Sequence, residues 1–213
     1  MVSNYEKIGR NDVLKPRFTS LQFQLESLVK LGDNVNSVLE VGPGRKYFYS
    51  MVKLLGYDIK TLDKYSELEQ DFECDVTELS VDNKVDAVVA FEVREHMPYD
   101  KSLAFFEELV RLSNKWVLIS LPIRHKRWRR LLKGRSPIIP DLPKVTREDH
   151  WNPHHWEVGT ASYPVNRVVA DLAYRGTELR SKFVNRYHRY HLFLTFEKNP
   201  VIEFWRAHDR DAG

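Results

Sequence analysis

The chain has 213 residues, of which 42% are hydrophobic, and a formal net charge of +3. That length and apolar content suit one compact fold, so we predict a single domain over residues 1–213. No apolar run approaches eighteen residues and no charged-then-apolar leader is recognisable, which argues against a membrane span and a secretory signal. The single cysteine, Cys74, excludes a disulfide within one chain and favours a reducing, cytoplasmic location.

Apolar runs and amphipathic stretches alternate along the chain. Apolar side chains at helical spacing up to Gly32 predict an N-terminal helix at about 17–31 that covers the sheet or a cofactor cleft. Further helices are expected at 46–55, at 100–112 and after Pro164. Strands are expected near 37–41, 58–63, 71–75, 84–91, 115–121, 178–185 and 190–197. This alternation predicts a single-domain α/β fold, a Rossmann-like doubly wound sheet of seven strands with right-handed crossovers and an antiparallel last strand.

The most informative segment is 37–44, which reads SVLEVGPG and predicts a buried strand followed by a glycine turn. Gly42 and Gly44 lack a Cβ, so they permit positive φ angles and the close approach of a ligand. A second apolar run ends at Asp63, nineteen residues after Gly44, where a carboxylate can accept hydrogen bonds from a ribose. Tyr47 occupies the last glycine place of the G-x-G-x-x-G dinucleotide motif, which disfavours NAD.

The E-x-G-x-G run that begins at Glu40 resembles the first motif of class I S-adenosylmethionine (SAM) methyltransferases. Three later segments fall in the order that this family shows: 74–79 resembles the acid after the third strand, 85–96 the fourth strand with its F-E-V-x-E-H continuation, and 116–122 the fifth strand. The resemblance covers roughly residues 35–122 and continues more weakly to 198. It implies SAM as the cofactor, with S-adenosylhomocysteine (SAH) as the product.

The resemblance also implies a set of cofactor contacts. Glu40, Gly42 and Gly44 would surround the methionine part, and Asp63 would bind the ribose. At the far end, Asp75 and the Val76 backbone would meet the adenine, and Glu92 would line the site beside the methionine part. For Asp63 and Asp75 the alternative is that they are polar strand ends facing water.

Two residues depart from the family pattern. Lys46 stands where many relatives have a third glycine, and Arg94 stands where an aliphatic residue is usual. Because a lysine can still open a helix, cofactor binding is not excluded. We expect Arg94 to point to solvent at a helix start, with contact to an anionic acceptor as the alternative.

Residues 123–163 are expected to form an insertion on the acceptor side. It opens with a stretch that begins at Arg124, ends at Arg135, and holds seven Lys or Arg residues and no acid, so the rest of the chain is net acidic. Such a run can be a solvated face. Because Trp128 and two leucines interleave with the cations, it can also bind an anionic membrane surface or a phosphorylated acceptor, which we rank above RNA.

A second cluster, HWNPHHWE, covers residues 150–157. Metal binding by His150, His154 and His155 is conceivable, but Pro153 argues against a simple helix that would align them, so we expect no metal. We favour an acceptor-pocket loop in which Trp151 or Trp156 forms a stacking wall.

Methyl transfer from SAM asks mainly for alignment of the acceptor, and a catalytic base is optional. The candidate catalytic residues follow the fourth and fifth strands or lie in the acceptor-side loop: Glu92, His96, His125, His154 and His155.

The runs at 154–168 and 185–196 resemble a poorly characterised group of bacterial and archaeal methyltransferase type 11-like proteins that often accompany surface-glycan genes. The favoured function is a SAM-dependent methyltransferase acting on a small-molecule or lipid/glycan-linked acceptor. The alternative is a non-catalytic protein of the same fold that binds membrane or nucleic acid through its basic segment.

Overall fold

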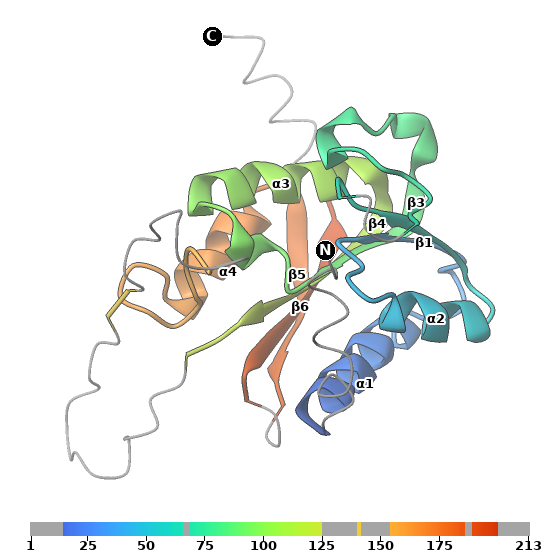
Figure 1. The fold of residues 1–213 in the computed structure, drawn as a ribbon. Coiled ribbons are helices and arrows are strands. Elements are labelled where there is room, and N and C mark those ends of the chain that lie inside the picture. The colour runs from blue at the N-terminus through green and yellow to red at the C-terminus, as the bar shows by residue number, and fades with distance from the viewer. Residues whose placement is uncertain (1–14, 66–68, 125–139, 142–153, 186–188, 200–213) are drawn as a thin grey trace, which may run out of the picture.

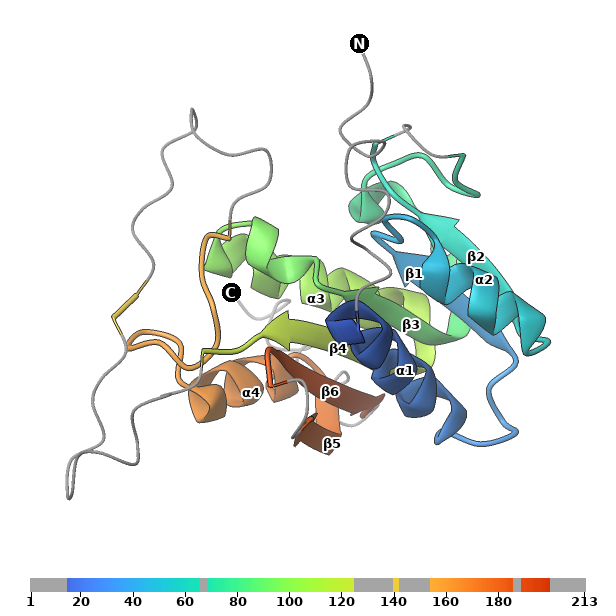
Figure 2. The same cartoon turned by 60° about the horizontal axis from the view of Figure 1, so that its bottom comes forward.

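A mixed β-sheet with helices on both faces forms the body of the molecule (Figure 1 and Figure 2). The computed structural model describes residues 15–65, 69–124, 140–141, 154–185 and 189–199. Helices α1 (Lys15–Val29) and α2 (Tyr47–Leu54) cover one face, and α3 (Tyr99–Leu112) and α4 (Val165–Ala173) cover the other. Among the described helices, none combines the length and apolar character that a membrane crossing requires.

Six strands make up the sheet in the described part of the chain. Their order is β2 (Asp58–Leu62), β1 (Ser37–Val41), β3 (Val85–Phe91), β4 (Ser113–Pro122), β6 (His191–Lys198) and β5 (Thr177–Val184). The first four run parallel, and β6 is antiparallel to both of its neighbours. The carboxyl ends of the parallel strands therefore meet the amino end of β6 at one edge, where open α/β sheets bind ligands. The predicted Rossmann-like fold class is confirmed.

The seventh strand, predicted near 71–75, does not form among the described residues. Phe72 makes one isolated parallel bridge to Leu62. Beside it, the Asp71 carboxylate accepts hydrogen bonds from the Thr61 backbone N–H at 2.7 Å and the Thr61 hydroxyl at 2.8 Å. A side chain thus occupies a β2 donor that a neighbouring strand would otherwise use, so the pairing stops after one bridge.

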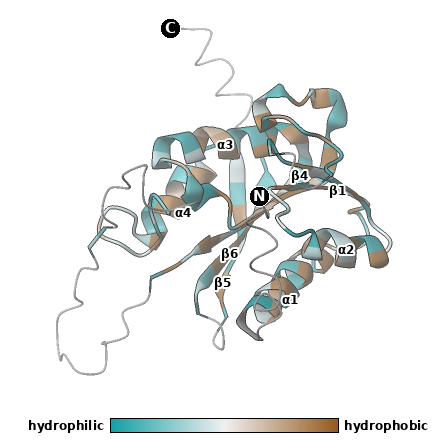
Figure 3. Ribbon diagram, in the orientation of Figure 1, coloured by the Kyte–Doolittle hydropathy of each residue, from teal (hydrophilic) through white to brown (hydrophobic). Residues whose placement is uncertain are grey.

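Apolar side chains fill both faces of the sheet, and Figure 3 shows hydrophobic colour along the central strands. Leu28 of α1 and Val52 of α2 are fully buried on one face. Phe106 of α3 and Leu172 of α4 are fully buried on the other. Because β1 and β3 are covered on both faces, they read as nearly continuous apolar runs in the sequence.

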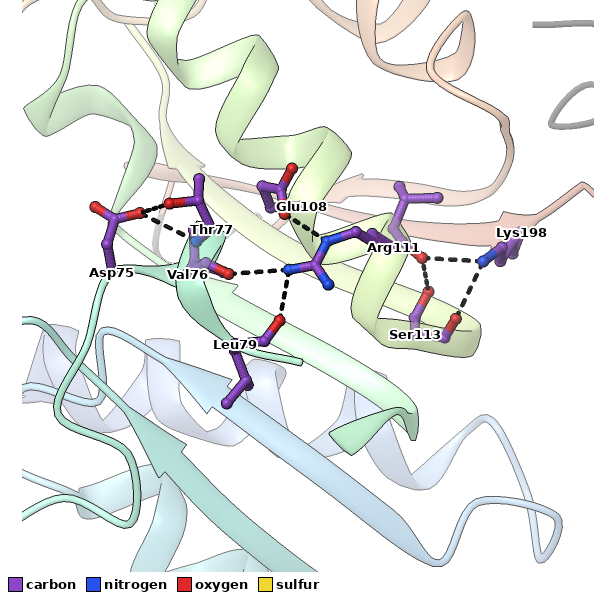
Figure 4. Close-up of polar contacts among 9 residues, drawn as sticks. Asp75, Val76, Thr77, Leu79, Glu108, Arg111, Ser113 and Lys198 are labelled. Carbon is purple, nitrogen blue, oxygen red and sulfur yellow. Dashed lines mark hydrogen bonds and ion pairs between the residues drawn. The ribbon is translucent and has the colours of Figure 1, made fainter. Parts of the chain in front are cut away.

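Arg111 ties the loop before β3 to α3 (Figure 4). Its guanidinium donates to the carbonyls of Val76 at 3.2 Å and Leu79 at 2.9 Å, and its Nε donates to the Glu108 carboxylate at 2.6 Å. Nearby, the Lys198 ammonium donates to two carbonyls at the α3–β4 junction. Arg111 therefore sets the position of the loop that carries Asp75.

Replacing Arg111 with Ala should lower the free energy of unfolding by about 1–3 kcal/mol, because the carbonyls of the buried Val76 and Leu79 lose their donor. Arg180→Ala is the matched control, since Arg180 is an exposed arginine paired with Glu178 and Glu197. We expect that control to change stability by less than about 1 kcal/mol. Urea unfolding of both variants measures the difference. Equal losses of unfolding free energy would contradict the role of Arg111 in holding this loop.

Candidate functional site

The turn after β1 is tightly packed at Gly42 and, in the described part of the chain, leaves open space at Gly44. Gly42 has φ +71°, and its N–H donates to the Leu62 carbonyl at 2.9 Å. A Cβ at Gly42 would lie 2.7 Å from Cγ2 of Val93, so the loop after β3 packs directly on this glycine. Gly44 has φ +51°, and a Cβ there would meet no atom within 4 Å among the described residues. A ligand can approach the backbone at Gly44.

Lys46 preserves the shape of the turn. It has φ +59°, the left-handed conformation that a glycine adopts at no steric cost, and its N–H donates to the Pro43 carbonyl at 2.9 Å. Helix α2 begins at the next residue, Tyr47. The lysine pays about 1–2 kcal/mol for this conformation. The missing third glycine therefore does not change the path of the chain.

Glu40, in strand β1, brings a buried carboxyl group to the glycine turn. It is 5% exposed, and its Oε2 has no hydrogen-bond partner among the described residues. Burial raises the pKa of Glu40 to about 8, although a backbone hydrogen bond from Tyr49 and the charge of Lys46 both lower it. Unpartnered buried polar atoms are rare in folded proteins, so Oε2 marks a place where a ligand donor fits.

Two more acids lie beyond β2. Asp63 is half-buried, accepts a hydrogen bond from the Tyr65 N–H at 3.1 Å, and has its pKa raised by burial. Asp75 caps the short helix η3 (Val76–Glu78), and its Oδ1 accepts from the N–H of Thr77 at 3.1 Å and its hydroxyl at 2.9 Å. The backbone hydrogen bond from Thr77 is the main reason that the pKa of Asp75 is lowered. The positive charge of Lys64 acts to lower the pKa of both carboxyl groups.

Glu92 directly follows β3 and is held from two sides. Its φ of +56° is left-handed. Its Oε1 accepts from the Ser120 hydroxyl at 2.6 Å, and its Oε2 lies 2.9 Å from Nε2 of His191. Nδ1 of His191 lies 2.7 Å from the Ser20 hydroxyl in α1. This series of polar contacts fixes the Glu92 carboxylate at the carboxyl edge of the sheet and holds α1 against the same edge.

The prediction that Arg94 points to solvent is wrong. Arg94 is completely buried between the rings of Phe106 and Trp156, at 5.5 Å and 5.6 Å from their centroids. It donates to the Ser102 carbonyl at 3.0 Å and to the Ser102 hydroxyl at 3.1 Å. Burial lowers the pKa of Arg94 to about 10. The short helix η5 (Arg94–His96) turns back onto α3 and carries the side chain inward.

The prediction of a stacking wall in the acceptor pocket is wrong for Trp156. It is 1% exposed, and its indole N–H donates to the Met97 carbonyl at 3.1 Å. Its ring packs edge-on against Tyr99 at 4.9 Å and beside Tyr163 at 5.6 Å. Trp156 therefore anchors its segment in the core, and Trp151 lies outside the described residues.

The candidate histidines fall into three groups. The rings of His96 and His154 meet edge-on, with centroids 4.9 Å apart. His155 has an exposed side chain, and its backbone N–H donates to the Glu95 carbonyl at 2.7 Å. His125 and His150 lie outside the described residues.

The predicted acceptor-side insertion is described only at 123–124, 140–141 and 154–163. Of the basic segment, Arg124 alone is described, and it forms an ion pair with Glu157.

No protein-family model matches the sequence, and no curated protein matches it either. Solved structures do match. The magnesium protoporphyrin IX methyltransferase of Synechocystis PCC 6803, with bound SAM, is 13% identical with a TM-score of 0.60, over 93% of this chain and 86% of that one. The Burkholderia thailandensis 1,6-didemethyltoxoflavin-N1-methyltransferase, with bound 1,6-didemethyltoxoflavin and SAH, is 12% identical with a TM-score of 0.64, over 92% of this chain and 83% of that one.

A SAM-dependent methyltransferase from Clostridium acetobutylicum is also 12% identical, with a TM-score of 0.60 over 92% of this chain and 96% of that one. The chain has the class I methyltransferase fold. Glu40, Asp63 and Glu92 lie at or just beyond the carboxyl ends of β1, β2 and β3. The sequence did not reveal His191 and Ser20, because their contact joins residues 171 positions apart.

The two glycines of the turn should respond differently to alanine. Both substitutions strain a left-handed backbone, which costs about 1–2 kcal/mol. Gly42→Ala should cost at least about 1 kcal/mol more than Gly44→Ala, because its Cβ would also collide with Val93. Chemical denaturation of the two variants tests the order, and a larger loss for Gly44→Ala would contradict the packing described here.

Proposed function

We propose that the chain is a SAM-dependent methyltransferase that acts on a small-molecule or lipid/glycan-linked acceptor. The observation that carries the proposal is the buried, unpartnered Oε2 of Glu40 beside the open turn at Gly44. In solved structures of the same fold, SAM or SAH is bound in the porphyrin and toxoflavin methyltransferases. Those two proteins are named for small-molecule substrates, which supports a small acceptor here.

The described residues fit the parts of SAM. The α-ammonium of its methionine part would donate to Oε2 of Glu40, with the Gly42 and Gly44 backbone alongside. Asp63, at the end of β2, would accept from the ribose hydroxyls. Oδ1 of Asp75 already receives both bonds from Thr77, which leaves Oδ2 for the adenine amino group.

When bound, SAM supplies a methyl group on a sulfonium and is already an activated donor. The chain's own residues then have to orient the acceptor and exclude water. Glu92, held by Ser120 and His191, is a fixed carboxylate at the end of β3 that can accept a hydrogen bond from an acceptor hydroxyl or amine. His96 is a candidate to orient the acceptor, and His155 is a candidate to take its proton.

The alternative function is a non-catalytic protein that binds membrane or nucleic acid through its basic segment, and the departures at Lys46 and Arg94 left room for it. Lys46 keeps the left-handed turn, and Arg94 is buried against α3, so neither residue obstructs the glycine turn. The basic segment 124–135 remains a proposed contact for an anionic acceptor or a membrane surface, and a cytoplasmic location with peripheral membrane contact is the accompanying proposal.

SAH should bind the purified protein with one-to-one stoichiometry in calorimetry. Asp63→Ala should weaken binding by about 1–3 kcal/mol, the cost of unpaired ribose hydroxyls. Asp58→Ala is the matched control, because Asp58 is an exposed acid at the opposite end of the same strand. No saturable heat with wild type at millimolar SAH, or equal losses in the two variants, would refute the assignment of this edge.

SAH binding at pH 7 should release a proton from Glu40. In the free protein the pKa of Glu40 is about 8, so the carboxyl group is mainly protonated at pH 7. An ammonium at Oε2 favours the carboxylate, which lowers that pKa and expels the proton. Calorimetry in phosphate and Tris, which have different ionisation enthalpies, measures the release. Glu40→Gln should remove the dependence of the binding enthalpy on the buffer. An unchanged dependence in that variant would show that another group releases the proton.

A further inference from the structure

Three potential metal ligands converge beside the glycine turn. Ligand atoms of Glu95, His96 and His154 all lie within 4.8 Å of one another. Glu95 and His96 belong to η5, which follows β3, and His154 comes from a segment 58 residues later. Val93, which packs on Gly42, immediately precedes η5, so the cluster lies next to the proposed cofactor turn.

Glu95 is the unusual member of this cluster. It is completely buried, and neither of its carboxylate oxygens has a hydrogen-bond partner among the described residues. Nε2 of His96 lies 3.8 Å from its Oε1. The charge of the adjacent Arg94 acts on this carboxyl group, but the Arg94 guanidinium donates its hydrogen bonds to Ser102. A buried carboxyl group without donors is costly, and a cation at this point would remove the cost.

His154 is oriented as metal-binding histidines usually are. Its Nδ1 lies 3.0 Å from Oε1 of Glu157, which leaves Nε2 to act as a ligand. Glu157 is in turn held by an ion pair with Arg124. A carboxylate that fixes one imidazole nitrogen is the common outer support of a metal-bound histidine. The His155 N–H, which donates to the Glu95 carbonyl at 2.7 Å, joins the two ligand segments.

We propose that Glu95, His96 and His154 form a binding site for a divalent transition-metal ion. Two imidazoles and one carboxylate suit Zn²⁺, Mn²⁺ or Co²⁺ better than Mg²⁺ or Ca²⁺, which prefer oxygen ligands. Ligand atoms at roughly 2.1 Å from a tetrahedral ion are about 3.4 Å apart, so side-chain rotations of modest size would close the cluster on the ion.

This set differs from the one considered in the sequence, His150, His154 and His155, which Pro153 argued against. Three protein ligands leave coordination positions for water or an acceptor oxygen, as in catalytic metal sites. An ion here would orient an acceptor hydroxyl and favour its deprotonated form. That role rests on the proposed methyl transfer, whereas binding of the ion does not.

Zinc titration of the chelator-treated full chain tests the site. Calorimetry should show one Zn²⁺ per chain, and Co²⁺ should give a visible absorption spectrum that Zn²⁺ abolishes. Glu95→Gln, His96→Ala and His154→Ala should each weaken Zn²⁺ binding by roughly tenfold or more, and Glu157→Gln by about tenfold or more through loss of the outer support. His155→Ala is the matched control for metal binding alone, because its exposed imidazole is not one of the three ligands, and the affinity of this variant for Zn²⁺ should equal that of wild type.

Glu95→Gln preserves the size of the buried side chain, and near-ultraviolet circular dichroism confirms that each variant is folded. Equal Zn²⁺ affinity in wild type and in the folded Glu95→Gln or His154→Ala variants would overturn the proposal, as would the absence of stoichiometric binding by wild type. SAH titration of the same samples separates the two proposals. Stoichiometric Zn²⁺ binding without SAH binding would refute the cofactor assignment and leave the metal site standing.

Discussion

The contact between Gly42 and Val93 is the constraint on which the site depends. It allows no Cβ at Gly42, because such an atom would lie 2.7 Å from a Val93 methyl group. The turn after β1 and the loop after β3 are thereby pressed together at the carboxyl edge of the sheet. Val93 leads directly into η5, which carries Glu95 and His96, so this contact fixes the start of that helix. The lack of a side chain at Gly42 thus sets the distance between the proposed cofactor and acceptor sides.

Three buried or partly buried carboxyl groups at this edge are satisfied to different degrees. Glu92 has partners on both oxygens, Ser120 and His191. Glu40 receives a backbone hydrogen bond and keeps one unpartnered oxygen, and neither carboxylate oxygen of Glu95 has a hydrogen-bond partner among the described residues. Burial raises the pKa of Glu40, and burial followed by the charge of Glu92 raises the pKa of Glu95 well above its ordinary value. Carboxyl groups whose pKa is raised in this way cluster at functional sites, where a ligand can offset the free-energy cost of burying them.

Hydrophobic periodicity and the glycine turn sufficed to predict the order of the helices and strands in the described residues, apart from the strand expected near 71–75. Burial of Arg94 could not be predicted, because it depends on η5 folding back onto α3, where Phe106 and Ser102 receive the guanidinium. The missing seventh strand depends on a side chain, since Asp71 takes a backbone donor of β2. Sequence patterns report local periodicity, and each of these outcomes is decided by a contact between elements.

The placement of His154 shows how an apolar anchor can position a polar ligand outside the sheet. Two residues after it, Trp156 is buried against Tyr99 and donates to the Met97 carbonyl. Val158 then bridges to Ile123, and Gly159 packs so tightly that a Cβ would lie 2.6 Å from the Arg124 carbonyl oxygen. The described part of this segment is therefore fixed by packing on β4 and α3. Since a metal site needs ligands held to a fraction of an ångström, such anchoring is what a ligand from outside the sheet requires.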